Sequence, residues 1–598
     1  IAKEKGLEPL AQTILAQVSC VVIMAEAAKY VDAEKDVADE AAALAGAKDI
    51  IAENVSDNAG YRTKIRELTM QKGRLISTAK DPKAESVYEM YYEFDEALSK
   101  VAGHRTLAIN RGEKEKILTV KIEAPTEDII KYLKKQVITN DGAPTAAVLT
   151  EVVEDAYDRL IAPAIEREIR NNLTEEAEDG AIKVFGKNLE QLLMQPPIAG
   201  QVVLGWDPAF RTGCKISVVD PTGKVLDTTV IYPTAPQNKV EEAKAVIKKL
   251  IDKHHVTLIS LGNGTASRES EQVIVELLKE IPVKVQYIIV NEAGASVYSA
   301  SKLATEEFPN FDVGQRSATS MARRLQDPLA ELVKIDPKSI GVGQYQHDMN
   351  QKKLSEALGG VVEDCVNKVG VDLNTASVSL LEYISGISKT IAKNIVDYRE
   401  ENGKFTSRSQ LLKVAKLGPK AFEQCAGFMR ISDGKNPLDA TGVHPESYDA
   451  TKAVLEKLGY TMEDVKNRNV VGISKKVSDY KALADEAGVG EITLRDIVKE
   501  LEKPARDPRE DMPKPILRSD VLEMKDLTPG MVLKGTVRNV IDFGCFVDIG
   551  VHQDGLVHIS EICDRYIKHP LEAVSVGDIV DVQVMSVDLK KQRIQLTM

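Results

Sequence analysis

The C-terminal stretch 526–598 constrains the fold more than any other part of this sequence. Short runs of alternating apolar and polar residues are separated by Gly and Asp, which is the pattern of β-strands joined by tight turns. Short strands of this kind predict a small closed barrel, because closing a sheet removes its exposed edges. The expected strands are 530–540, 542–549, 555–560, 577–584 and 593–598.

Two phenylalanines indicate what this barrel could bind. Phe543 and Phe546 flank Gly544, so a kinked strand can present both rings on one face. An exposed ring stacks on an unpaired base of any identity, which is worth roughly 1–3 kcal/mol per base. The alternative is that Phe546 is an ordinary core residue. Further candidates for the same surface are the planar imidazole of His558, which can donate a hydrogen bond, and three cations that can contact phosphates: Lys534, Arg538 and Arg593.

The strand order and these residues resemble the S1 RNA-binding domain, a five-stranded barrel of the OB fold. The resemblance implies that the aromatic residues, His558 and the three cations form a nucleic-acid-binding face. The whole chain, however, has 78 basic and 91 acidic residues and a net charge of −13. A polyanion must therefore bind at a local patch, and we expect a modest, salt-sensitive affinity.

Residues 199–335 form a second segment, in which the spacing of the apolar residues is no longer that of helices alone but indicates both strands and helices. Closely spaced strands with a turn signal at 221–223 predict antiparallel hairpins, and helices and strands alternate after them. This is the order of the ribonuclease H superfamily, and the segment resembles its YqgF subgroup, relatives of Holliday-junction resolvases. The expected strands are 201–206, 215–219, 225–231, 258–261 and 285–290, and the expected helices are 240–253, 267–280 and 318–333.

Three carboxylates of this segment raise the question of catalysis. Asp207 ends the first strand, Glu292 ends the last strand, and Asp327 falls in the final helix. In the fold that the segment resembles, these places converge at one edge of the sheet, beside the polar loop 262–269. Carboxylates there would hold Mg²⁺ and could support phosphodiester hydrolysis.

Two prolines depart from the pattern of the subgroup. Pro208 follows the first Asp, and Pro328 favours Asp327 as the cap of a new helix instead of a metal ligand. One alternative is a Mg²⁺-dependent nuclease or resolvase that uses Asp207, Glu292 and Asp327. The other is a fold retained as a scaffold without activity. We expect the scaffold, with no required cofactor.

Residues 372–435 contain two glycine turns, each followed by a helical segment, which resemble a double helix-hairpin-helix. Backbone N–H groups at such a turn and at the following helix N-terminus favour a phosphate. Each turn keeps only one glycine of the usual pair, so a helical packing module without a ligand is the alternative. The candidate phosphate-binding residues are Gly386, Lys389, Lys393, Gly418 and Lys420.

The remaining segments read as helical. We expect a helical region over 1–198, interrupted by strands at 105–110 and 117–122, a helical linker over 336–371, and a helical region with a proline-marked linker over 436–525. The fold class is thus a multidomain, mostly α-helical scaffold that carries an α/β ribonuclease H-like domain (199–335), a double helix-hairpin-helix (372–435) and an S1-like barrel (526–598).

The cellular setting follows from other features of the sequence. Six cysteines lie far apart without a C-x-x-C pair, which fits a reducing cytosol. The longest nearly unbroken apolar stretch, 18–28, is about half of the roughly 20 residues that a membrane span needs. We therefore expect a cytoplasmic protein without a membrane partner. Because the chain begins with Ile1 instead of Met, we also expect a preceding segment.

The order of these segments is similar to the Tex family of bacterial transcription accessory proteins. The resemblance rests on motif blocks at 5–11, 108–115, 207–215, 290–301 and 334–348. It implies a nucleic-acid-binding factor linked to transcription, with single-stranded RNA as the partner and DNA as a second candidate. The remaining alternative is a docking hub for RNA polymerase or the ribosome. No Walker A loop is present, so the sequence gives no support to an ATPase.

Overall fold

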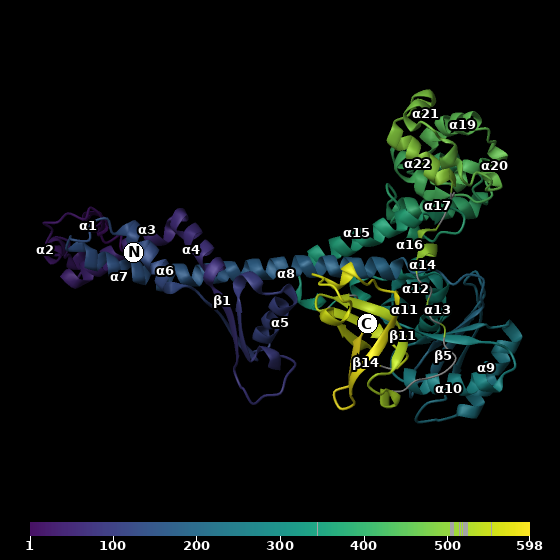
Figure 1. Ribbon diagram of the computed structural model, residues 1–598, viewed down its shortest axis with the longest axis horizontal. Coiled ribbons are helices and arrows are strands. Elements are labelled where there is room, and N and C mark those ends of the chain that lie inside the picture. Colours follow the sequence, from purple (N-terminus) through teal and green to yellow (C-terminus); the bar gives the residue numbers. More distant parts are fainter. Residues whose placement is uncertain are drawn as a thin grey trace. The chain divides into compact units, whose positions relative to one another are not determined.

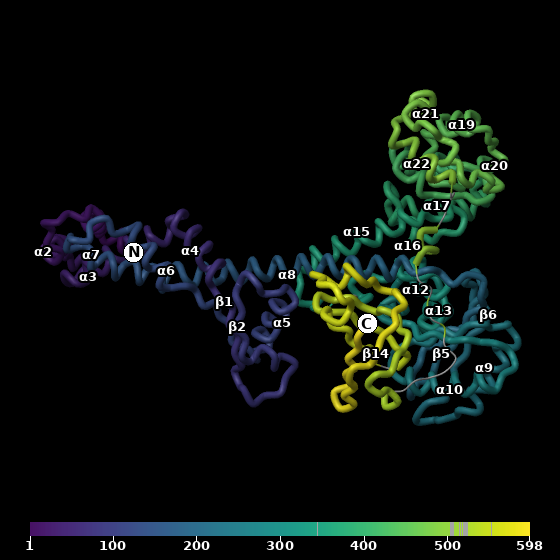
Figure 2. Tube along the Cα trace, in the orientation of Figure 1, coloured from purple at the N-terminus to yellow at the C-terminus, as the bar shows by residue number. Residues whose placement is uncertain are grey.

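The computed structural model describes residues 1–341, 343, 345–502, 507–512, 515, 517, 524–551 and 553–598. It divides into two compact units, Ile1–Ala181 and Ile182–Met598. The long helix α8 (Ala162–Leu193) begins in the first unit and ends in the second. Figure 2 follows the chain from its purple N-terminus to the yellow C-terminal module. No helix in the described part of the chain is both long enough and apolar enough to span a bilayer.

The first unit is helical around a small sheet. Its sheet has the order β2-β1-β3, with β1 (Arg74–Ala79) between β2 (Glu93–Ala97) and β3 (Leu118–Glu123). The strand expected at 105–110 is wrong, because Gly103–Lys114 forms helix α5. Four consecutive residues, 106–109, are buried, and β3 pairs with β1 instead. The other helices are α1 (Glu8–Leu15), α2 (Ile23–Ala28), α3 (Glu40–Asp57), α4 (Ala59–Lys72), α6 (Thr126–Val137) and α7 (Thr145–Asp155).

The second unit begins with a five-stranded sheet of the order β6-β5-β4-β7-β8. The first three strands are antiparallel, whereas β4, β7 and β8 are parallel, which confirms the ribonuclease H-like order. The strands are β4 (Val203–Asp207), β5 (Cys214–Val219), β6 (Val225–Ile231), β7 (Leu258–Gly262) and β8 (Gln286–Val290). The helices are α9 (Val240–His254), α10 (Ser267–Glu280), α11 (Ala295–Ser299), α12 (Lys302–Glu307), α13 (Val313–Gln326) and α14 (Pro328–Leu332).

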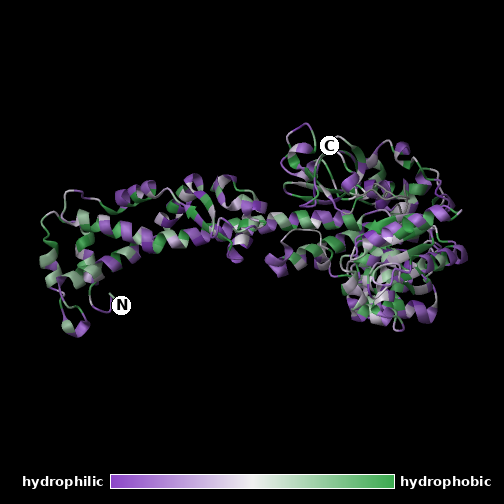
Figure 3. Ribbon diagram, turned by 90° about the horizontal axis from the view of Figure 1, so that it is seen from below, coloured by the Kyte–Doolittle hydropathy of each residue, from purple (hydrophilic) through white to green (hydrophobic). Residues whose placement is uncertain are grey.

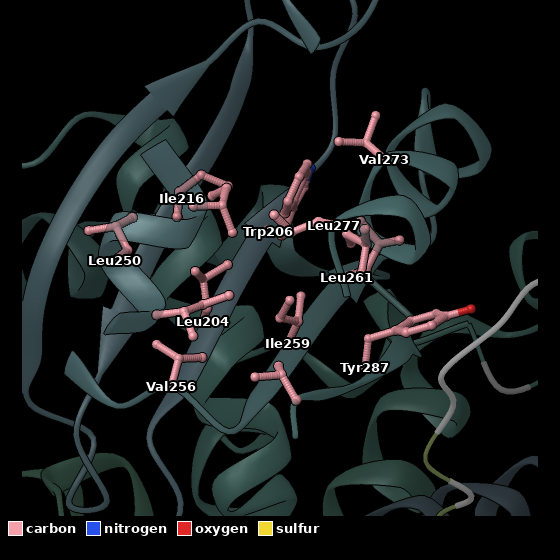
Figure 4. Packing of buried hydrophobic residues seen from close by; sticks show 14 of the residues in the cluster. Leu204, Trp206, Ile216, Leu250, Val256, Ile259, Leu261, Val273, Leu277 and Tyr287 are labelled. Carbon is pink, nitrogen blue, oxygen red and sulfur yellow. The ribbon is translucent and has the colours of Figure 1, made fainter. Parts of the chain in front are cut away.

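Helices cover both faces of this sheet because successive residues of a strand point to opposite sides. Leu204 and Trp206 of β4 belong to a core that also contains residues of α9 and α10 (Figure 4). Val203 lies on the other face, in a cluster with Ala322 of α13. Gly205 permits this close packing, since a Cβ at that position would lie 2.1 Å from the carbonyl oxygen of Ala318.

A helical segment follows, as expected. Helix α15 (Gln351–Val369) precedes the short helix α16 (Val378–Leu381) and the helices α17 (Lys389–Asn402) and α18 (Pro419–Cys425) of the two expected hairpins. Four further helices come next: α19 (Tyr448–Lys457), α20 (Met462–Lys466), α21 (Tyr480–Ala487) and α22 (Glu491–Glu502). The proline-marked linker expected after them lies partly outside the described residues.

The C-terminal module is a closed barrel of the order β11-β12-β13-β15-β14, which confirms the expected fold. Its strands are β11 (Val532–Ile541), β12 (Gly544–Asp548), β13 (Gly555–His558), β14 (Ile579–Asp588) and β15 (Arg593–Thr597). Apolar side chains such as Val537, Cys545 and Val557 fill its interior. Apolar and polar residues are interspersed along the strands and helices of the whole chain (Figure 3).

The barrel contacts the end of α8 within the second unit. The side-chain amide of Asn188 donates to the carbonyl oxygen of Val540 at 2.7 Å. The backbone N–H of Val576 donates to the side-chain oxygen of Gln191 at 2.5 Å. Leu192 packs against the apolar core of the barrel. The end of α8 thus binds the C-terminal module through hydrogen bonds and apolar packing.

Candidate nucleic-acid interface

The aromatic residues of the barrel lie on the outside of strands β12 and β13. Phe546 alternates with the buried Cys545 and Val547, so its ring points away from the core. Opposite it, in register, are Leu556 of β13 and Asn539 of β11. Phe546 is partly exposed and is not among the residues that form the core, which supports the surface assignment.

Phe543 and His558 lie at one end of this strip. His558 is paired in register with Gly544, directly after Phe543. A Cβ on Gly544 would lie 2.3 Å from the carbonyl oxygen of Val557, so only glycine permits this approach of the strands. The N–H of Ile559 donates to the carbonyl oxygen of Phe543 at 2.8 Å, which fixes the turn beside His558.

The three candidate cations of the barrel occupy different places. Arg538 lies in a β-bulge between Val537 and Asn539, beside the strip, and faces Asp548 at 3.7 Å and Asp554 at 3.8 Å. Bulges often redirect side chains at binding sites. Arg593 lies two residues before Gln595, which neighbours Leu556, so Arg593 shares the outer face.

Lys534 is separate from this strip. It pairs in register with Asp581 of β14, on the part of β11 that does not contact β12. The structure therefore brings Phe543, Phe546, His558, Arg538 and Arg593 onto one side of the barrel and leaves Lys534 on another.

Phe546 also lines a cavity of about 360 Å³ within the second unit. Other walls come from the end of α8, the end of β8 and helices α13 and α14. Arg324 and Arg538 contribute the cationic groups that line it. Phe546 is thus half-enclosed, whereas His558 is exposed. Phe543 and Phe546 are both partly exposed, so both rings keep some surface open to solvent.

The two glycine hairpins share one backbone conformation. Gly386 has φ +82° and Lys416 has φ +67°, and each is followed by a buried apolar residue and then by the cap of a helix. In the first turn the N–H of Ile387 donates to the residue three positions earlier at 3.0 Å, and the second turn repeats this bond at 3.2 Å. Lys416 therefore takes the place that glycine occupies in the first hairpin.

The hairpins contact each other reciprocally. The side-chain amide of Asn394, on α17, donates to the carbonyl oxygen of Ala415 in the second turn at 2.9 Å. Gly386, in the first turn, lies against Gln424 of α18, where a Cβ would come within 2.7 Å of a side-chain oxygen. The two turns thus belong to one module.

Exposed lysines surround these turns. Lys389, Lys393 and Lys420 are exposed, as is Gly418 at the cap of α18. Lys416, which takes the place of a glycine in the second turn, is also exposed, although it was not among the candidate phosphate-binding residues.

At the edge of the ribonuclease H-like sheet, Asp207 and Glu292 come together. Burial raises the pKa of the Asp207 carboxyl, against a hydrogen bond from Ser317 and the charge of Lys215. Burial also raises the pKa of the Glu292 carboxyl, and the charge of Asp207 raises it further. The expected loop lies beside them: a Cβ on Gly264 would lie 1.6 Å from a carboxylate oxygen of Glu292.

Asp327 does not join these two carboxylates. Helix α13 places Ser317, near its start, beside Asp207. Asp327 follows Gln326 at the other end of this helix, where the side-chain amide of Gln326 donates to the carbonyl oxygen of Asp220 at 2.6 Å. Asp327 caps α14 by accepting the N–H of Ala330 at 3.2 Å, as Pro328 predicts.

The carboxylate of Asp327 also accepts a hydrogen bond from Arg509 at 2.6 Å. Arg509 is 182 positions further along the chain, so no local pattern could indicate this partner. Among the described residues, no three acidic, histidine or cysteine side chains are grouped to hold a metal ion. The proposed three-carboxylate magnesium site therefore does not fit this arrangement.

Comparison with known families covers most of the chain. A Tex central region-like model matches residues 21–185, and a Tex protein YqgF-like domain matches 201–326. A helix-hairpin-helix motif matches 366–430, a further HHH domain matches 436–509, and an S1 RNA-binding domain matches 526–598. The sequence interpretation treated 436–509 only as helical, although Gly472 begins a Gly-Ile-Ser-Lys run like that of Gly386 and has the same φ of +82°.

Full-length relatives agree with these matches. The chain is 55% identical to the uncharacterized protein YdcI of Bacillus subtilis over 100% of this chain and 83% of the relative. It is 45% identical to protein tex of Bordetella pertussis, over 100% of this chain and 77% of the relative. It is 44% identical to transcriptional accessory protein Tex of Neisseria gonorrhoeae, over 100% of this chain and 79% of the relative. With its barrel, hairpins and ribonuclease H-like sheet all matched in order, the chain belongs to the Tex family.

Proposed function

We propose that this chain is a nucleic-acid-binding transcription accessory factor that binds single-stranded RNA through its barrel and phosphate backbone through its hairpins. The observation that carries the proposal is the strip of Phe543, Phe546 and His558 on the outside of β12 and β13. The family resemblance adds support, since a relative is named a transcriptional accessory protein.

Base stacking supplies the affinity at the barrel. Each base that stacks on an aromatic ring contributes roughly 1–3 kcal/mol, whatever its identity. Arg538 adjoins this strip, where a phosphate would compete with Asp548 and Asp554, which form ion pairs with the guanidinium at 3.7 and 3.8 Å. Single-stranded RNA is favoured over a duplex, because only an unpaired base exposes its face to an aromatic ring.

The hairpins supply the second contact. The N-terminus of α17 attracts a phosphate through its helix dipole, with Lys389 and Lys393 exposed on its first turns and Lys420 at the neighbouring turn. DNA or RNA can satisfy this contact, because a phosphate carries no base identity. Two weak contacts on one chain raise the apparent affinity without new interactions.

The ribonuclease H-like domain acts in this proposal as a scaffold instead of a nuclease. The helix position beside Asp207 is Ser317, and Asp327 is engaged by Arg509. We propose that the chain acts in the cytoplasm, where RNA polymerase or the ribosome would be its protein partner. Pull-down with and without nuclease treatment separates direct docking from contact through RNA.

The proposal is tested at the barrel by replacing Phe543 and Phe546 together with Ala. We expect the affinity for a fluorescent oligouridylate to fall at least about tenfold at low ionic strength, because two stacking surfaces are lost. Met585→Ala, at an exposed residue of β14, is the matched control. Equal affinity of the double variant and the parent protein would refute the stacking face.

A further inference from the structure

Tyr566 is an exposed ring of the barrel that no part of the proposed function uses. Its exposed fraction is 89%, the highest of any aromatic residue among the exposed large hydrophobic side chains of the described chain. An isolated exposed apolar residue is ordinary on a protein surface and needs no explanation. Tyr566 differs from such residues in two respects: its loop is anchored to the barrel, and cations lie on both sides of it in the sequence.

The loop is anchored on both sides of the ring. Ile562 and Ile567 are both buried in the barrel core, so that only the tip between them is exposed. The N–H of Lys568 donates to the Glu572 carboxylate at 2.8 Å, and Arg565 donates to the carbonyl oxygen of Glu572 at 3.4 Å. A ring on a fixed loop loses little conformational freedom when a ligand stacks on it.

The loop also lies next to the strip that carries Phe543. A ring nitrogen of His569 is 3.0 Å from the carboxylate of Asp542, the residue directly before Phe543. Tyr566 lies three positions before His569, a chain span of about 10 Å at most. The loop that carries Tyr566 is thus tied to the end of the strand region that carries Phe543.

Two cations flank the ring. Arg565 and Lys568 are both exposed, on either side of Tyr566. An aromatic ring between two cations can bind single-stranded nucleic acid, because the ring stacks on a base while the cations contact the phosphates. Asp564 is also exposed and offsets part of this charge.

We propose that Tyr566 stacks a second unpaired base of the RNA strand bound at Phe543, with Arg565 and Lys568 on the phosphates between the two bases. The inference rests on the proposed function, because it extends the strand that the barrel binds. It adds a site on the loop between β13 and β14 that the strand pattern did not suggest.

The test uses the full chain, with Tyr566→Ala, Tyr566→Phe and the control Tyr232→Ala, another exposed tyrosine, which lies outside the barrel. We expect the affinity for single-stranded oligouridylate to fall at least about fivefold in Tyr566→Ala. Tyr566→Phe keeps a flat ring and should bind as the parent does, as should Tyr232→Ala. If Tyr566→Ala binds as tightly as the parent while the Phe543 variant is weakened, the inference is overturned and the proposed function stands.

A spectroscopic readout separates contact from indirect effects. Trp206 is the one tryptophan of the sequence and is fully buried, so Tyr566→Trp adds a single exposed indole. Stacking of a base should quench its emission in step with binding. Emission that does not change while the variant still binds RNA would overturn the inference. If neither the Phe543 variant nor Tyr566→Ala loses affinity, both proposals fail together.

Discussion

Lys416 is held in a backbone conformation that glycine adopts more easily, and replacing it should reveal a conflict between stability and binding. Its φ is +67°, in the left-handed region that costs an ordinary L-residue roughly 1–2 kcal/mol. Lys416→Gly removes this strain. Glycine also raises the conformational entropy of the unfolded chain, which lowers the free energy of unfolding by about 0.4–1 kcal/mol. We therefore expect a net stabilisation of about 0.5–1 kcal/mol.

Hydrogen exchange of the amides in α17 and α18 is the suitable assay, because a multidomain chain does not unfold in a single step. Protection of these amides should increase by about twofold to fivefold in Lys416→Gly, if they exchange through opening of the whole module. Lys416→Ala is the matched control, because alanine keeps the strain and should leave protection nearly unchanged. Both variants lose the same charge, so both should bind an oligonucleotide more weakly and with a smaller salt dependence.

The first hairpin should respond in the opposite way. Gly386 has φ +82°, and a Cβ there would meet Gln424 at 2.7 Å, so Gly386→Ala should destabilise the module by about 1–3 kcal/mol. The reasoning is refuted if Lys416→Gly loses protection, or if Lys416→Ala gains as much as Lys416→Gly does.

Three further changes test other parts of the structure. Glu292→Gln should stabilise the ribonuclease H-like domain at neutral pH. The raised pKa of Glu292 means that its ionised form is disfavoured in the folded state. The gain in stability of the variant should therefore disappear as the pH falls below the ordinary pKa of 4.5, which a pH series of melting temperatures measures. Ser317→Asp places a third carboxylate beside Asp207 and should create a Mn²⁺ site, detected by calorimetry, that the parent lacks; equal heats in both would contradict this. Arg408→Leu should destabilise the helix-hairpin-helix region by about 3–5 kcal/mol, measured by hydrogen exchange of the amides in α17 and α18, because Arg408 is buried and donates to the carbonyl oxygens of Met429 and Val443; a loss below 1 kcal/mol would contradict the role of these bonds.

Local patterns predicted the elements whose structure is set by neighbouring residues. The barrel strands follow from alternation and turn residues, and the helix cap at Asp327 follows from Pro328. The ring of Phe546 lies outside the core because its neighbours Cys545 and Val547 point inward. These features depend on a few consecutive residues, so one sequence is sufficient to find them.

Contacts between distant residues explain the rest. The segment 105–110 was expected as a strand, but β3 has β1 as its partner and 105–110 packs as part of α5. Asp327 pairs with Arg509, and no spacing rule links positions so far apart. The candidate metal site depended on the direction of α13, which puts Ser317, not Asp327, next to Asp207.

The central claim is that an anionic chain binds nucleic acid through small local sites on two modules. The most direct measurement is the affinity of the full chain for single-stranded RNA over a series of salt concentrations. It compares the parent with Phe543→Ala and with a variant that carries Lys389→Gln and Lys420→Gln. We predict binding at low ionic strength, a weaker affinity with an unchanged salt slope for the barrel variant, and a shallower slope for the lysine variant. A chain that binds no RNA at low ionic strength, or variants whose affinities and slopes equal those of the parent, would contradict the account.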